Sequence, residues 1–138
     1  WIQEAVKEGA RVLCGGAARG AIFEPTLLTD VKTTAKVCRE EVFAPLIVLF
    51  PFKDLTEAIA AVNDSPYGLQ AGIFTNNLAN ALRVFETLEV GGIILNDIPS
   101  WRMDTMPYGG VKDSGLGREG IRYAIEEMTE MRLLVICP

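Results

Sequence analysis

The sequence predicts an α/β fold, layered, with a mostly parallel sheet flanked by helices. Short apolar stretches typical of buried strands alternate with helical patterns along the 138 residues. Strands separated by helices of about 10 to 15 residues are typical of parallel strands joined by crossover helices. Glycine, proline and asparagine stand between the segments as turn signals. No internal repeat and no linker divides the chain, so we expect one domain.

The first half of the chain predicts one helix and three extended segments. The helix covers WIQEAVKEGA and closes on Gly9, as helices commonly do. RVLCGG then predicts a short strand and a turn. In EPTLLTDV, Pro25 favours an edge strand or a loop, because proline cannot donate to the centre of a sheet. PLIVLFPF is apolar throughout, which predicts a strand buried on both faces.

Two helices in the middle of the chain carry their own start signals. Asp54 and Glu57 form a capping box at the start of DLTEAIAAVNDS, where each side chain satisfies backbone N–H groups of the first turn. Asn76 or Asn77 caps the helix NNLANALRVFETL. The apolar residues that share one face of this second helix are Leu78, Leu82 and Phe85.

Two apolar strands, LQAGIFT and GGIILN, flank that second helix. Asn96 ends the later strand, and its side chain is expected to bond to loop backbone. A polar, glycine-rich loop runs from Asp97 to about Leu116, and a helix covers roughly residues 118–128. RLLVI predicts a final strand. We expect residues 131–138 to pair with another subunit or another domain, because an exposed apolar edge is adhesive.

The composition argues against several classes of function. The formal net charge of −5 disfavours a nucleic-acid partner, which needs clustered Lys and Arg. No apolar stretch approaches the ~20 residues of a membrane span, and no secretory leader is recognised, so no membrane partner is expected. Without histidine, and with three scattered cysteines, no metal site is expected. The odd cysteine number predicts a reducing, cytoplasmic compartment.

The run GLGREG, residues 115–120, matches the G-x-G-x-x-G pattern of dinucleotide-binding turns. That pattern needs a strand before it, a helix after it and an acidic residue about 20 positions further on. Here the preceding GGVKDS is polar and glycine-rich, which makes a poor strand. We therefore interpret the run as a loop that leads into a helix, and the match as coincidental.

Three stretches, in order, resemble the aldehyde dehydrogenase superfamily. EEVFAP resembles its E-E-x-F-G-P motif, with Ala44 in place of the usual glycine. NDSPYGLQAGIFT resembles N-x-S-x-Y-G-L-x-A-x-V-F-T. MPYGGVKDSGLGREG resembles P-F-G-G-x-K-x-S-G-x-G-R-E, with Tyr108 where many members have phenylalanine. The resemblance covers nearly the whole chain, so residues 1–138 are identified as a partial catalytic domain, a C-terminal fragment of such an enzyme.

The resemblance implies an oxidoreductase that converts an aldehyde to a carboxylate with NAD or NADP as cofactor. In the family a cysteine thiolate attacks the aldehyde to form a thiohemiacetal, and a glutamate base serves the later hydrolysis. Both residues belong upstream of Trp1 in the family's layout. No catalytic residue is therefore assigned here, and the chain alone is expected to be inactive. Cys14 and Cys38 are interpreted as inert thiols, although Arg39 beside Cys38 favours its thiolate.

The resemblance also implies residues that bind the cofactor and line the substrate tunnel. Glu41 hydrogen-bonds the nicotinamide ribose, since a carboxylate accepts from two adjacent hydroxyls, and Phe43 supplies a flat wall beside the nicotinamide. The alternative is a capped turn with Phe43 in the core. Tyr108 lines the substrate tunnel, and its alternative is a core aromatic residue at a turn.

Arg102 stands just before this substrate-lining aromatic residue. A guanidinium there can bind a carboxylate or phosphonate on the aldehyde through two hydrogen bonds. The alternative is a surface ion pair with Asp104, and the sequence favours neither. The expected partners are a small aldehyde and further copies of the chain in a homo-oligomer. A non-catalytic assembly or interaction module with the same fold is the competing hypothesis.

Overall fold

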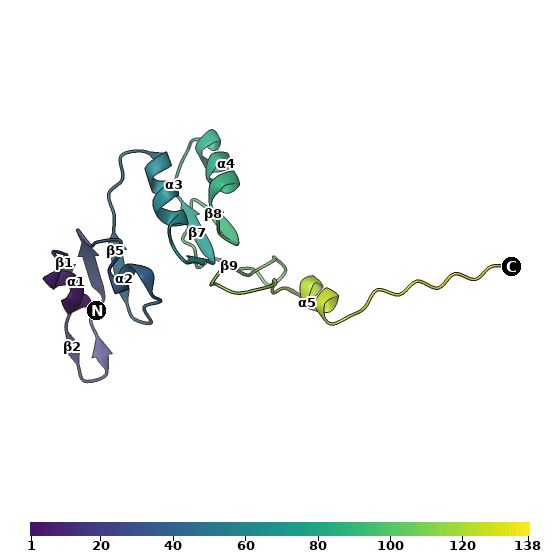
Figure 1. The fold of residues 1–138 in the computed structure, drawn as a ribbon, viewed down its shortest axis with the longest axis horizontal. Coiled ribbons are helices and arrows are strands. Elements are labelled where there is room, and N and C mark those ends of the chain that lie inside the picture. Colours follow the sequence, from purple (N-terminus) through teal and green to yellow (C-terminus); the bar gives the residue numbers. More distant parts are fainter. The chain divides into compact units, whose positions relative to one another are not determined.

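The computed structural model describes residues 1–138, which have the predicted α/β fold, with mixed sheets. The chain divides into two compact units, Trp1–Ala61 and Val62–Pro138, and the boundary falls inside the helix α3 (Leu55–Asn63). Figure 1 shows the elements of both units along the chain. None of the helices combines the length and the apolar character that crossing a membrane would require.

The first unit is built on a three-stranded sheet with the order β1–β4–β5. β1 runs antiparallel to β4, whereas β4 and β5 are parallel, and a small antiparallel hairpin of β2 and β3 joins β1 to β4. The elements of this unit are α1 (Ile2–Lys7), β1 (Arg11–Cys14), β2 (Ala18–Arg19), β3 (Ile22–Phe23), β4 (Thr26–Thr29), α2 (Lys36–Arg39) and β5 (Leu46–Leu49).

The core of the first unit lies on one face of this sheet. Leu28 of β4 is fully buried there, together with Ala5 of α1 and Val37 of α2. Successive residues of a strand point to opposite faces. Ile47 of β5 points to the other face and is 63% exposed, so the prediction of a strand buried on both faces is wrong for β5 in this chain.

β4 is the central strand of the sheet, and the expectation of an edge strand or loop at this place is wrong. Pro25 lies immediately before β4 rather than within it. The first N–H of the strand, that of Thr26, donates to the backbone oxygen of Pro45 at 2.8 Å. The N–H that proline lacks is therefore not needed by the ladder.

The second unit holds two separate strand pairs. β7 and β8 are parallel and are connected through α4, whereas β6 and β9 are antiparallel. The elements are β6 (Tyr67–Gly68), β7 (Gln70–Ile73), α4 (Leu78–Thr87), β8 (Gly92–Leu95), β9 (Val111–Lys112) and α5 (Ile121–Glu127). The β7–α4–β8 connection is the crossover that the alternating sequence pattern predicts.

Both helix caps predicted in the middle of the chain are confirmed. Asp54 Oδ1 accepts from the backbone N–H of Glu57 at 3.0 Å. Glu57 Oε2 in turn accepts from the N–H of Lys53 at 2.8 Å, one residue earlier than a capping box requires. Asn77 Oδ1 accepts from the N–H groups of Ala79 at 2.9 Å and Asn80 at 3.3 Å, which identifies Asn77 as the cap of α4.

The predicted apolar face of α4 is exposed within this chain. Leu78, Leu82 and Phe85 are 67%, 52% and 70% exposed, whereas Val84 is buried. The side of α4 that carries Val84 is therefore the packed one. The side with Phe85 is open within this chain.

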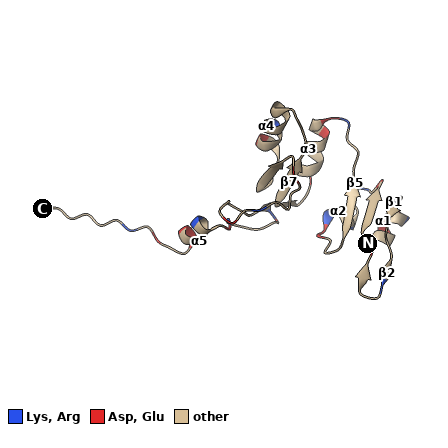
Figure 2. Cartoon of the chain, turned by 180° about the vertical axis from the view of Figure 1, so that it is seen from behind, with Lys and Arg blue, Asp and Glu red and all other residues tan.

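Residues 129–138 form neither a helix nor a strand, so RLLVI makes no strand within this chain. Figure 1 shows this segment extended beyond α5. Figure 2 shows that it is mostly uncharged, in contrast to the charged residues spread over the helices and loops. The apolar residues of this tail, Met131, Leu133, Leu134, Val135 and Ile136, are all exposed. Pairing of the tail with another chain or domain stays a prediction.

Candidate functional site

The segment Tyr108–Glu119 of the second unit organises the first part of the candidate site. Its strand β9 pairs with β6, and two further bonds secure the turn after β9. The N–H of Gly68 donates to Ser114 Oγ at 2.9 Å, and the N–H of Asp113 donates to the oxygen of Pro66 at 3.0 Å. Residues 111–114 are thus attached to β6 and to Pro66, the residue before it.

Lys112 attaches the same segment to the end of α3. Its Nζ donates to the backbone oxygens of Asn63 at 2.7 Å and Ser65 at 3.1 Å, and it pairs with Glu89 Oε2 at 2.8 Å. The Lys112 side chain is only 22% exposed, whereas that of Glu89 is 61% exposed. Sequence reasoning missed this role, because the two backbone partners are 49 and 47 residues away along the chain.

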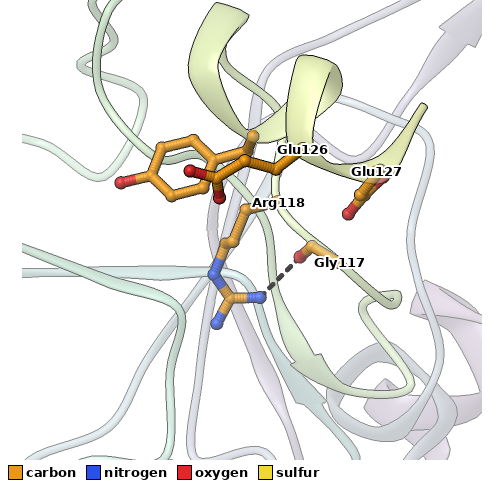
Figure 3. A pocket seen from close by; sticks show the side chains of 5 residues that line it. Gly117, Arg118, Glu126 and Glu127 are labelled. Atoms are coloured by element: carbon orange, nitrogen blue, oxygen red, sulfur yellow. Dashed lines mark hydrogen bonds between the residues drawn. The ribbon is translucent and has the colours of Figure 1, made fainter. Parts of the chain in front are cut away.

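Arg118 holds the second half of the segment. Its Nη1 donates to the backbone oxygens of Gly110 at 2.9 Å and Gly117 at 2.7 Å, the latter bond being drawn in Figure 3. A Cβ atom added at Gly109 would lie 2.7 Å from the oxygen of Gly117, so this turn has no room for a side chain. Gly120 has a φ of 119° and precedes α5. The prediction that GLGREG is a loop leading into a helix is confirmed.

The structure brings Arg102 and Tyr108 together, and it adds Glu119 to them. The Cζ atom of Arg102 lies 4.2 Å from the centroid of the Tyr108 ring, a cation–π contact. Arg102 Nη2 donates to Glu119 Oε2 at 2.6 Å. Tyr108 and Glu119 are themselves joined by two backbone bonds, of 3.1 Å and 2.6 Å. The three side chains therefore form one small cluster.

The ion pair of Arg102 differs from the alternative that the sequence left open. Its partner is Glu119, 17 residues further on, and not Asp104. The Arg102 side chain is 47% exposed, and Tyr108 is half-buried, so neither is a core residue. No local pattern indicates Glu119, since its nearness to Arg102 comes from the antiparallel bridge between residues 108 and 119.

Glu41 and Phe43 lie in the first unit, in the segment between α2 and β5. Both are exposed, Phe43 by 90%, so the alternative of a core Phe43 is wrong in this chain. The Glu41 carboxylate makes no hydrogen bond or ion pair within the chain. The turn closes through the N–H of Ala44, which donates to Val42 O at 2.8 Å. Ala44 has no positive φ, so its methyl group is tolerated there.

All three cysteines are free thiols. Cys14 and Cys137 are exposed, whereas Cys38 is half-buried and packs against the core of the first unit. Burial raises the pKa of the Cys38 thiol, and the neighbouring Arg39 charge only partly opposes this. A raised pKa leaves less of the thiolate that nucleophilic attack requires. That environment agrees with an inert thiol.

A shallow pocket of about 380 Å³ lies between α5 and the loop before it (Figure 3). Arg118 and Glu126 are among its lining residues, and both have partners within the chain. Arg118 bonds two backbone oxygens, and Glu126 Oε1 accepts from Arg122 Nε at 2.8 Å. No group of three or more metal-ligating side chains gathers here or elsewhere in residues 1–138.

Comparisons with protein families and with curated proteins point to the same family. The model of the aldehyde dehydrogenase family matches residues 1–134. A 3-sulfolactaldehyde dehydrogenase of Priestia megaterium is 53% identical over 136 residues, which cover 99% of this chain and 28% of that protein. The chain therefore spans little more than a quarter of the length of this relative.

Solved structures give the same result. Aldehyde dehydrogenase 21 of Physcomitrella patens, in complex with its reaction product succinate, is 48% identical with a TM-score of 0.95, over 99% of this chain and 28% of that one. The glyceraldehyde-3-phosphate dehydrogenase GapN of Methanocaldococcus jannaschii, complexed with NADP, is 43% identical with a TM-score of 0.86, over 92% and 27%.

Proposed function

The chain belongs to the aldehyde dehydrogenase family, and we propose that it is the C-terminal part of a longer NAD(P)-dependent enzyme that oxidises an aldehyde to a carboxylate. The family match over residues 1–134 carries this proposal. The 28% share of its relatives' length supports a longer protein. The cysteine that forms the thiohemiacetal and the glutamate base then belong to the part of the enzyme outside residues 1–138.

The residues assigned to the cofactor have the properties that this role needs. NAD(P), when bound, accepts the hydride that leaves the substrate carbon. The Glu41 carboxylate has no partner within the chain, so both oxygens are available to the two hydroxyls of a ribose. The Phe43 ring is 90% exposed and can cover a flat apolar group. Glu41 and Phe43 therefore fit a nicotinamide riboside, and we assign them to orienting it.

We propose that the aldehyde carries an anionic group, which Arg102 binds while Tyr108 lines the path to the reacting carbon. The related 3-sulfolactaldehyde dehydrogenase is named for a sulfonate, and the Physcomitrella enzyme holds succinate. A guanidinium is always charged and matches the paired oxygens of a carboxylate or sulfonate. The Arg102 side chain is half exposed, so it is accessible to such a group in this chain.

The test is the Arg102→Gln variant of the full-length enzyme. The KM for 4-oxobutanoate, an anionic aldehyde, is expected to rise about tenfold or more, because a charge-assisted hydrogen bond is lost. The KM for pentanal, a neutral aldehyde of similar length, should stay the same. Arg122→Gln removes an exposed arginine outside the cluster and serves as the control. A shift of equal size for both aldehydes would remove Arg102 from substrate recognition.

The same assay separates the enzyme from the non-catalytic module. A full-length protein that reduces neither NAD nor NADP with any aldehyde of a broad panel would favour an assembly or interaction role. Exposed apolar residues of α5 and the tail support homo-oligomer formation, which we propose as well. Sedimentation of the full-length protein, with and without residues 131–138, tests whether the tail takes part.

A further inference from the structure

We propose that Glu119 is the positioning residue that holds the Arg102 guanidinium in place for the anionic group of the aldehyde. This inference rests on the proposed function of Arg102. It starts from the cluster in which Arg102 contacts Tyr108 on one side and Glu119 on another. An unanchored arginine side chain would have to be ordered when the substrate binds, and that ordering weakens binding.

Two contacts fix the plane of the guanidinium. Its Cζ lies 4.2 Å from the centroid of the Tyr108 ring, so the ring supports the group from one side. Its Nη2 donates to Glu119 Oε2 at 2.6 Å. The backbone on the N-terminal side is also held, because Gln70 Nε2 donates to the oxygen of Trp101 at 3.4 Å. Together these contacts define where the remaining donors point.

The pair with Glu119 leaves most of the donor capacity of Arg102 free. A guanidinium has five N–H donors, and the bond to Glu119 Oε2 is the one that Arg102 makes within the chain. The two edges of a guanidinium that can bind two oxygens of one anion are Nε with Nη2 and Nη1 with Nη2, and Nη2 has one N–H group on each edge. Glu119 thus occupies one N–H group of Nη2, and the second N–H of Nη2 with its neighbouring nitrogen on the other edge stays available to the substrate.

The Glu119 side chain has no comparable role in holding the loop together. The bonds between residues 108 and 119 are made by backbone atoms, of 3.1 Å and 2.6 Å, and do not involve the carboxylate. The carboxylate is 64% exposed, and exposed ion pairs contribute little to stability. Its substitution should therefore release Arg102 without unfolding the segment.

The experiment uses Glu119→Ala and Glu119→Gln in the full-length enzyme. Glu119→Ala should raise the KM for 4-oxobutanoate about three- to fivefold, because the guanidinium loses its anchor, with kcat and the KM for pentanal unchanged. Glu119→Gln keeps an oxygen that accepts from Nη2, and it should recover the KM to within about 1.5-fold of the parent. Glu126→Ala, which breaks an exposed pair with Arg122, is the matched control and should change neither constant.

Three outcomes would overturn the proposal. An unchanged KM for 4-oxobutanoate in Glu119→Ala would show that Arg102 needs no anchor. A lowered KM would show that the carboxylate competes with the substrate anion. A fall in kcat shared by both aldehydes would assign Glu119 to chemistry common to all substrates. Thermal unfolding of each variant checks that the fold is retained.

A double-mutant cycle separates failure of this inference from failure of the proposed function. In the Arg102→Gln background, Glu119→Ala should have no further effect on the KM for 4-oxobutanoate, because nothing remains to be positioned. If Arg102→Gln discriminates between the two aldehydes and Glu119→Ala does not, the positioning role alone is wrong. If Arg102→Gln itself does not discriminate, both proposals are wrong.

Discussion

The two parts of the candidate site are held in very different ways. The segment Tyr108–Glu119 is fixed by backbone pairing, by Lys112 and Arg118, and by a bond to Ser114. The segment 40–45 is held by backbone bonds at Glu40, Ala44 and Pro45, and it exposes the side chains of Glu41 and Phe43. Residues 108–119 therefore keep their geometry within this chain.

The two segments differ in which groups hold their side chains in place. Residues that point a side chain at a substrate need support from neighbouring side chains and backbone. For Arg102 and Tyr108 that support lies in the second unit itself. For Phe43, 90% exposed, support must come from groups that this chain does not provide. Substitutions in the two segments should accordingly affect different measurements.

The largest expected effect is on the stability of the second unit. Lys112→Met removes three interactions of a side chain that is only 22% exposed, and leaves the oxygens of Asn63 and Ser65 without their donor. We expect the free energy of unfolding to fall by about 2–3 kcal/mol. Urea unfolding followed by circular dichroism measures this, with Arg122→Gln as an exposed control. Equal stability of Lys112→Met and the parent would contradict a fixed segment.

An intermediate effect is expected on the KM for the cofactor, with no change in stability. In the full-length enzyme, Glu41→Gln should raise the KM for NAD or NADP about fivefold, because the amide replaces a charged acceptor of the ribose hydroxyls. The urea midpoint of the isolated chain should not change, since the Glu41 side chain has no partner in it. Steady-state kinetics with both dinucleotides provides the measurement. Unchanged kinetics with both would remove Glu41 from the cofactor site.

The smallest expected effect concerns the pH dependence of Cys38. Burial raises the pKa of this thiol, so the folded chain forms the thiolate at a higher pH than the unfolded chain does. Its contribution to stability is full below the unfolded pKa and is lost as the pH rises toward the folded pKa. With Cys14 and Cys137 changed to serine, iodoacetamide reaction rates in native and urea-unfolded chains report the two pKa values. If the pH midpoint of the reaction rate were lower in the native chain than in the unfolded chain, the effect of the Arg39 charge on the thiol pKa would exceed that of burial.

Much of the fold could be predicted because its signals are local. The caps at Asp54 and Asn77 depend on residues within one helical turn, and both are confirmed. Asn96 also behaves as expected, since its Oδ1 accepts from the N–H of Thr75 at 2.8 Å. The predictions from the sequence fail where the result depends on contacts with distant parts of the chain. Pro25 and Ile47 illustrate this, because neither the central place of β4 nor the exposure of one face of β5 is encoded in the residues nearby.

The residues of the candidate site also fall into those that the sequence identified and those that only the structure shows. The motifs drew attention to Arg102 and Tyr108, and the structure brings these two together. Glu119 and Lys112 were not recognised, although both lie inside the same motif. Their partners are 17 and 49 residues distant, and only the fold brings them near. The role of each motif residue in holding the site is thus set by tertiary contacts.

The β6–β9 pairing also has a consequence for the order in which the second unit folds. The bond between Gly68 and Ser114 spans 46 residues, and that between Lys112 and Asn63 spans 49. Closing such loops is entropically costly, and long-range contacts slow folding. β7, α4 and β8 lie between the two ends and can form by shorter-range contacts. We therefore expect the Tyr108–Glu119 segment to dock in the latest step of folding.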